Sequence, residues 1–178
     1  MKKIVFMVVA VLTLTACSTF QTPRYAISVD NVQKLKKYEG AKAEVISLSQ
    51  PTSFDSNCRG GAPIKPADGL TFSQFISKAF NDEFKLAGIY SEDHIKISVE
   101  ITKIEFSSMD SLFNGYWDIG LKLASSNGKS LSVSNKYTFD SEWDGLAACK
   151  ATAGALPPAV QDLINATITD SEFCKLLK

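Results

Sequence analysis

Residues 70–106 read LTFSQFISKAFNDEFKLAGIYSEDHIKISVEITKIEF, and they hold the two patterns that decide the fold. Thr71 followed by Gln74 is typical of a capping box, with apolar residues on either side that form the staple around it. The apolar residues after this cap fall on one helical stripe: Phe72, Phe75, Ile76, Ala79, Phe80, Phe84 and Ala87. Gly88 is placed to end the helix in the left-handed conformation. The stretch predicts a helix over 72–87, whose phenylalanines each gain roughly 1.5–3 kcal/mol when buried against a flat partner.

The second half of this stretch predicts that partner. Apolar residues alternate with polar ones from Ile95 to Ile101, which is the period of a half-buried strand. The alternation then resumes with the opposite parity at Ile104 and Phe106. A change of parity within one strand predicts a β-bulge, here near residues 102–103.

Two more alternating segments, 117–123 and 131–139, flank an Asn-Gly dipeptide. A two-residue hairpin loop at this dipeptide would send the apolar residues of the two strands to opposite faces. A three-residue loop with Gly128 in the left-handed conformation instead pairs Leu123 with Leu131 and gives one apolar face. We therefore expect the three-residue loop with a bulge.

The rest of the chain completes an α+β fold. The further elements expected are a strand over 25–30, a strand over 43–48, a long loop over 50–69, and helices over 147–155 and 157–168. The element order is therefore β-β-α-β-β-β-α. We expect a two-layer sandwich in which two main helices cover one face of a largely antiparallel sheet of about five strands.

The amino terminus has the pattern of an export signal. Lys2 and Lys3 precede an apolar run too short to cross a bilayer, and the run ends in Leu-Thr-Ala before Cys17. This ending is similar to the bacterial lipobox, in which the cysteine sulfur receives a diacylglyceryl group and becomes the first residue. The sequence thus predicts a signal peptide over 1–16, with Cys17 as the lipid attachment site.

The predicted location follows from this anchor. Residues 17–24 are expected to be the lipidated cysteine and a short tether, and residues 25–178 a single periplasmic domain. Ser18 after the anchor is typical of lipoproteins that move on to the outer membrane. We therefore expect a membrane partner through the lipid, with the domain held near the outer membrane and facing the periplasm.

Charge excludes one large class of partners. The chain has 19 basic and 19 acidic residues, and removing Lys2 and Lys3 leaves 17 against 19. The basic residues are scattered, so the chain lacks the clustered positive face that binding to a phosphate backbone requires. Nucleic acid is not an expected partner.

Three cysteines remain once Cys17 carries lipid. Chain entropy gives about 4.6 kcal/mol for closing Cys58 to Cys149 and about 3.5 kcal/mol for Cys149 to Cys174, which does not separate the two pairings. Local context favours Cys58–Cys149, because both lie in segments that can adapt to disulfide geometry, and leaves Cys174 as a free, packing thiol. The Cys149–Cys174 pairing remains the alternative.

The sequence contains few residues that could serve as catalytic groups. His94 is the single histidine, and it follows a polar turn at the start of a strand. Glu100 and Glu105 could pair as carboxylates, but they lie on either side of the expected bulge on a generally polar face. No cysteine or histidine pair has the spacing of metal ligands, so no metal or cofactor is expected. The sequence favours a non-enzymatic binding module; an envelope hydrolase that uses carboxylates is the alternative.

Such a module would bind an envelope protein, lipid or glycan. Three surfaces could serve it: the sheet face opposite the helices, the 50–69 loop and the turn over 110–116. Leu112, Phe113 and Tyr116 are unusually apolar for an exposed connection, and exposed apolar patches often mark interaction sites.

Short motifs over residues 57–177 carry a resemblance to a family. They are Cys58-Arg59-Gly60, Phe106-Ser107-Ser108, Trp117-Asp118-Ile119, Ser125-Ser126-Asn127-Gly128, Tyr137-Thr138-Phe139, Ala148-Cys149 and Ala159-Val160-Gln161. In these residues the chain resembles a group of uncharacterised proteobacterial outer-membrane lipoproteins. The resemblance implies an anchored periplasmic domain in which Cys58 and Cys149 are bonded. Cys174 lies outside the pattern, and the resemblance brings no activity with it.

Overall fold

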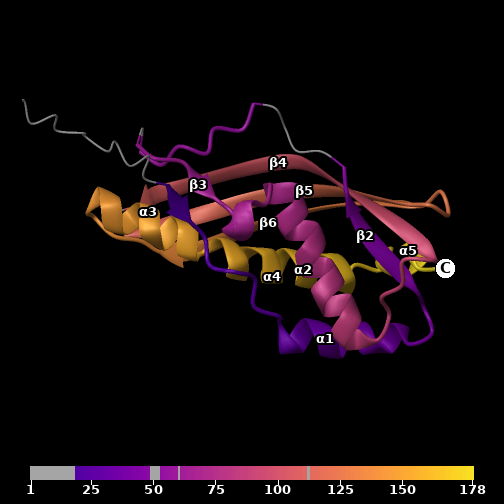
Figure 1. Cartoon of the computed structure of the whole chain (residues 1–178). Helices are drawn as coiled ribbons and strands as arrows, with labels where there is room; N and C mark the ends of the chain where they lie inside the picture. The colour runs from indigo at the N-terminus through magenta and orange to yellow at the C-terminus, as the bar shows by residue number, and fades with distance from the viewer. Residues whose placement is uncertain (1–18, 49–52, 60, 112) are drawn as a thin grey trace, which may run out of the picture.

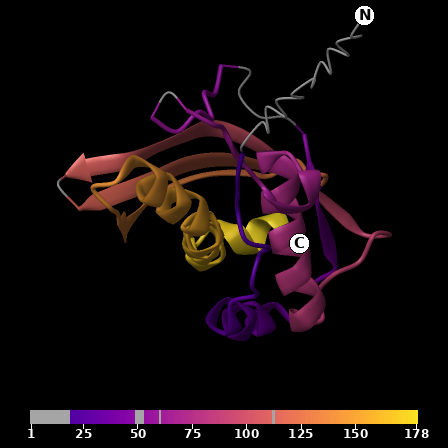
Figure 2. The same ribbon diagram turned by 60° about the vertical axis from the view of Figure 1, so that its left-hand side comes forward.

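The computed structural model describes residues 19–48, 53–59, 61–111 and 113–178. Within them, a four-stranded sheet in the order β2-β4-β5-β6 carries the helices on one face, and a small two-stranded sheet joins β1 to β3 (Figure 1). The elements are β1 (Phe20–Gln21), α1 (Val29–Leu35), β2 (Ala43–Ser47), β3 (Ile64–Lys65), α2 (Phe72–Ala87), β4 (Ile95–Ser111), β5 (Asn114–Ser125), β6 (Ser130–Asp140), α3 (Gly145–Gly154), α4 (Leu156–Thr169) and α5 (Phe173–Leu176). The predicted α+β class is confirmed, and Figure 2 shows the two layers from the side.

Helix α2 forms as its sequence predicts. The Thr71 side chain accepts a hydrogen bond from the Gln74 backbone N–H, and the Gln74 side chain accepts one from the Thr71 N–H. Gly88 ends the helix at φ 76°, a conformation that glycine adopts without strain. All four phenylalanines of the stripe are at least 95 % buried, so this helix supplies much of the core.

The predicted registers of the antiparallel strands are confirmed. Leu123 lies opposite Leu131 and Trp117 opposite Tyr137, and Gly128 turns the three-residue loop at φ 86°. The β4–β5 register shifts between Ile101 and Lys103, which is where the parity of the sequence changes. Each register follows from keeping one face of the strands apolar.

Strand β2 joins the sheet differently from the other three. It pairs in parallel with the beginning of β4, from Ala43 opposite Ile95 to Ser47 opposite Val99. Because α2 connects the two strands, β2, α2 and β4 form a parallel crossover unit. The sheet is thus antiparallel over β4, β5 and β6 and parallel at the β2 edge.

The predicted strand over 25–30 is wrong. Ser28 is instead the N-cap of α1, where its Oγ accepts a hydrogen bond from the Asn31 N–H. Tyr25, the first residue of the alternating pattern, turns its hydroxyl to the buried carboxylate of Glu83 on α2. A tertiary contact and a helix cap therefore override an alternation of apolar residues that is only three positions long.

The domain also begins before residue 25. Phe20 and Gln21 pair in parallel with Ile64 and Lys65, and the Arg24 guanidinium is bonded to both carboxylate oxygens of Asp68. Residues 20–24, predicted as tether, are therefore part of the folded domain. The predicted signal peptide and Cys17 lie outside the described residues.

The predicted long loop is held down along its described length. Residues 53–57 run beside the part of β4 that β2 leaves unpaired, and the Phe54 ring packs edge-on against Phe72 at 5.2 Å. The loop contains strand β3 and a 3₁₀ turn over Ala67–Gly69. Residues 50–52 and 60 of this loop lie outside the described residues.

Candidate interaction surface

The β4–β5 hairpin ends in a tight turn, where the sequence predicts a longer connection over 110–116. Ser111 pairs with Asn114. Both strands therefore extend beyond the residues in which apolar and polar side chains alternate. Phe113 sits in this turn with 61 % of its surface exposed. Tyr116 lies within β5, half-buried, with the Lys136 Nζ 3.9 Å from its ring centroid. Leu112, the third predicted residue, lies outside the described residues.

Ser141, directly after β6, hydrogen-bonds the end of this hairpin through its backbone and its side chain. The Ser141 N–H donates to the Phe113 carbonyl at 2.6 Å, and the Ser141 hydroxyl donates to the Ser108 carbonyl. Gly115 packs beneath the ring of Phe139, which leaves no space for a Cβ atom there. The exposed ring of Phe113 therefore belongs to a residue whose backbone carbonyl is tied to the end of β6.

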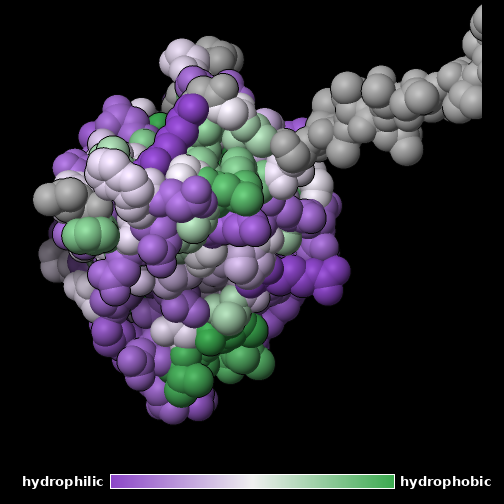
Figure 3. All heavy atoms as spheres, turned by 90° about the vertical axis from the view of Figure 1, so that its left-hand side faces the viewer, coloured by the Kyte–Doolittle hydropathy of each residue, from purple (hydrophilic) through white to green (hydrophobic). Residues whose placement is uncertain are grey.

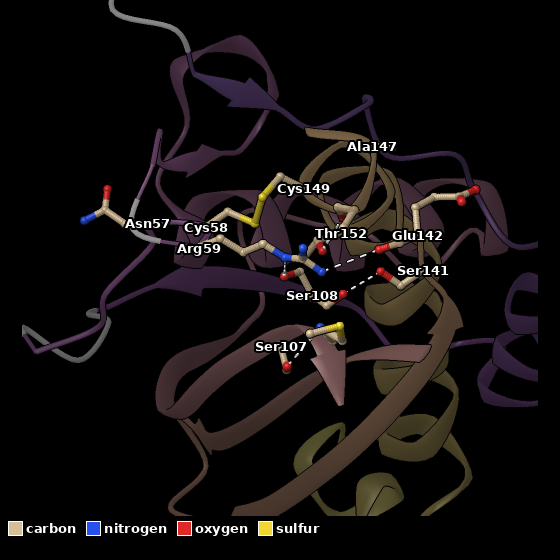
Figure 4. Close-up of a disulfide and its surroundings, with 12 residues drawn as sticks. Asn57, Cys58, Arg59, Ser107, Ser108, Ser141, Glu142, Ala147, Cys149 and Thr152 are labelled. Atoms are coloured by element: carbon tan, nitrogen blue, oxygen red, sulfur yellow. Dashed lines mark hydrogen bonds between the residues drawn. A yellow bond between two sulfur atoms is a disulfide. The ribbon is translucent and has the colours of Figure 1, made fainter. Parts of the chain in front are cut away.

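A disulfide and an arginine join three segments next to this tip (Figure 4). Cys58 and Cys149 are bonded, with their Cα atoms 5.9 Å apart, as favoured from the sequence. Cys174 is half-buried and forms no disulfide with any described residue. Arg59 donates from Nε to the Ser108 Oγ at 3.0 Å and from Nη1 to the Trp143 carbonyl at 3.2 Å.

Four large apolar side chains are exposed on the hairpin tip and on the segments that these links join. We call them the disulfide-end surface: Met109 (45 % exposed), Phe113 (61 %), Trp143 (68 %) and Leu146 (58 %). Figure 3 faces this end of the molecule and shows hydrophobic residues in separate patches among hydrophilic ones. Exposed apolar patches often mark interaction sites.

Trp143 and Arg59, which lie at this end of the molecule, were not singled out from the sequence. Trp143 precedes a helix of small residues and is not part of any periodic apolar pattern. A large aromatic residue outside such a pattern is the one sequence feature that could have indicated an exposed position. Arg59 is one of only two arginines in the chain, but its contacts join residues more than 45 positions apart. Contacts at that separation leave no local pattern.

The open face of the sheet, also predicted as a candidate, is polar. Lys96 is paired with Glu44 at 2.5 Å and Lys103 with Asp118 at 2.7 Å, each pair lying across neighbouring strands. Glu100 and Glu105 both lie exposed along β4. Glu105 is 3.5 Å from the Lys103 Nζ. This face offers charge and hydroxyl groups, in contrast to the apolar disulfide end.

His94 has a serine beside it. The Ser91 Oγ lies 2.8 Å from the His94 Nδ1 in an exposed turn before β4. A nucleophilic serine also needs an oriented base and a site for the oxyanion; in the described part of the chain, no carboxylate is hydrogen-bonded to this imidazole. Across the same residues, no group of three histidine, cysteine or acidic side chains is placed to hold a metal ion.

A buried acid lies at the other end of the helical layer. The Glu83 side chain is completely buried, and its Oε1 accepts hydrogen bonds from the Tyr25 hydroxyl, the Ser28 N–H at 3.2 Å and the Asn31 Nδ2 at 3.3 Å. Its Oε2 has no hydrogen-bond partner among the described residues. Burial raises the pKa of the Glu83 carboxyl, since the charged form loses its hydration.

This network lies next to a polar groove between α1 and α4, and Asn31 belongs to both. The groove has a volume of about 320 Å³ and is wide open to solvent. Asn31 links it to the buried acid, since its Nδ2 also donates to the Gln161 carbonyl at 2.9 Å. Because Asn31 and Glu83 join α1, α2 and α4, the network holds the helical layer together.

Comparison with solved structures supports the fold. A Xanthomonas campestris protein of the DUF330 family superimposes with a TM-score of 0.54 at 14 % identity, over 85 % of this chain and 95 % of the other. A candidate lipoprotein from Caulobacter crescentus gives a TM-score of 0.43 at 12 % identity, over 84 % and 93 % of the two chains. No protein-family model and no curated protein matches the sequence. The chain therefore shares the fold of the DUF330 protein.

A helix that crosses a membrane needs about 20 consecutive, mostly apolar residues. Over the ranges that the structure describes, none of them is both long and apolar enough to span a bilayer.

Proposed function

We propose that this protein is a lipid-anchored, non-enzymatic binding module of the bacterial cell envelope. A diacylglyceryl group on Cys17 holds it at the outer membrane, and the domain faces the periplasm. The observation that carries the proposal is the lipobox-like ending of the signal sequence, three residues before the first strand of a folded domain. The periplasm is oxidising, and the Cys58–Cys149 disulfide is consistent with it.

The hairpin tip is the surface that best suits a protein partner. Phe113 is exposed, and the hydrogen bond from the Ser141 N–H to its carbonyl limits the backbone freedom that this residue would lose on binding. Aromatic residues, phenylalanine included, are enriched at the cores of protein–protein interfaces. The partner is expected to be another envelope protein with an apolar pocket for this ring.

Site-specific photocrosslinking in intact cells tests this role. A photoreactive residue in place of Phe113 should give a discrete adduct, whereas the same residue in place of Lys122, exposed on the open sheet face, should not. Adducts of equal yield at both positions, or none at Phe113, would argue against a partner at the tip. Equal expression of both variants and intact disulfides provide the control for folding.

The non-enzymatic role is tested with the residues that an enzyme would need. The variants His94→Ala and Glu100→Gln should each complement every phenotype of a deletion strain as well as the natural chain does. Both side chains are exposed, so neither change should disturb the fold. Loss of complementation by either variant at normal protein levels would favour the hydrolase.

A further inference from the structure

The outer face of α3 is exposed and carries one large apolar side chain and one basic side chain. Leu146 and Lys150 are spaced by four residues and therefore lie one above the other on this face, and the exposed Trp143 precedes the helix by two residues. The helix buries its opposite side through Ala148, Cys149 and Ala153. None of the ten residues of α3 is acidic.

The predicted lipid anchor emerges beside this helix. Strand β1 packs against α3, and Thr19 and Phe20 line one hollow together with Lys150 and Gly154. Cys17 precedes Thr19 by two residues, which span at most about 7 Å even when fully extended. A lipid on Cys17 therefore brings the bilayer surface close to α3.

The side chains on this face suit the boundary between water and hydrocarbon. Trp is enriched there, because its ring is apolar and its N–H still finds a hydrogen-bond acceptor. Lys150 can extend its ammonium to the phosphates while its methylenes stay near the acyl chains. Two or more acyl chains already attach the protein stably, so contact through the helix would set the orientation of the domain.

We propose that the α3 face, formed by Trp143, Leu146 and Lys150, rests in the headgroup region of the phospholipid layer that holds the Cys17 lipid. The inference depends on the lipid anchor of the proposed function. The domain then lies with α3 against the membrane, and the opposite end, which carries α5 and the carboxyl terminus, projects into the periplasm (Figure 1).

Tryptophan fluorescence of the lipidated full chain tests this orientation. The protein is reconstituted into vesicles of phosphatidylethanolamine and phosphatidylglycerol, with or without brominated acyl chains that quench on contact. Trp143 and the completely buried Trp117 are the two tryptophans of the chain. We expect brominated lipid to remove the Trp143 emission and to leave the Trp143→Phe variant unquenched.

A second exposed apolar position provides the matched control. Val29, at the start of α1, is 71 % exposed. In the Trp143→Phe background, Val29→Trp should stay unquenched. Quenching at position 29 in place of 143, or at neither, would overturn the proposed orientation.

The anchor is tested separately from the orientation. If Cys17 is lipidated and the protein floats with the vesicles while Trp143 stays unquenched, the orientation is wrong and the anchor stands. If Cys17 carries no lipid, the proposed function itself fails.

Discussion

The Cys58–Cys149 disulfide should supply a large part of the stability of this domain. It links residues 91 positions apart, and chain entropy alone gives about 4.6 kcal/mol for closing a loop of that length in the unfolded state. A domain of this size is stable by only about 5–15 kcal/mol. The double change Cys58→Ala and Cys149→Ala should therefore lower the free energy of unfolding by about 4–5 kcal/mol.

Urea unfolding of the purified domain measures this loss. With a dependence on urea of about 2 kcal/mol per molar, the midpoint should fall by about 2 M, and reduction of the natural chain should give the same result. Cys174→Ala is the control, since this thiol is half-buried and forms no disulfide with a described residue. A double variant that is no less stable than Cys174→Ala would refute the reasoning. The contacts of Phe54 and Arg59 would then be sufficient to hold the loop in place.

Three further changes test particular contacts. Gly115→Ala should cost about 1–3 kcal/mol in urea unfolding, because its Cβ would meet the Phe139 ring and lie 2.6 Å from a backbone oxygen; an unchanged midpoint would contradict this. Because burial raises the Glu83 pKa in the folded state, that state holds the proton more tightly than the unfolded chain, and stability falls as pH rises above the ordinary value of 4.5. Glu83→Gln should remove this fall, so its stability relative to the natural chain should rise between pH 4 and pH 7; parallel pH curves would refute it. Arg59→Lys should cost about 1 kcal/mol and increase hydrogen exchange around Trp143, since lysine cannot keep both hydrogen bonds; unchanged exchange would show that they do not hold the segment.

Most of the sheet and its main helix could be predicted, because their signals are local and redundant. The cap at Thr71, the phenylalanine stripe and Gly88 all indicate the same helix. The register of β5 against β6 follows from a single requirement, that the apolar residues share one face. Where several independent preferences agree, the sequence determines the structure closely.

The parts that could not be predicted depend on contacts far apart in the chain. Residues 25–30 alternate like a strand, but Glu83, more than 50 positions away, binds Tyr25 and the start of α1. Strands β1 and β3 are two residues each, too short for any periodic signal. Their pairing starts the domain at Phe20 and brings the chain after Cys17 against α3.

The residues of the candidate interaction surface were predicted only in part for the same reason. Phe113 could be proposed because an apolar residue in a turn is conspicuous. Trp143 and Leu146 become part of one surface only when β1, the disulfide and Arg59 bring the start of α3 beside the hairpin tip. Sequence spacing carries no information on that juxtaposition.

The chemical state of Cys17 tests the central claim most directly. Trypsin cleaves after Arg24, so protein isolated from membranes should release an amino-terminal peptide of residues 17–24 for mass spectrometry. The account predicts that this peptide begins at Cys17 and carries a diacylglyceryl group on its sulfur. An unmodified Cys17, or a peptide that still retains residues of the signal sequence, would contradict it.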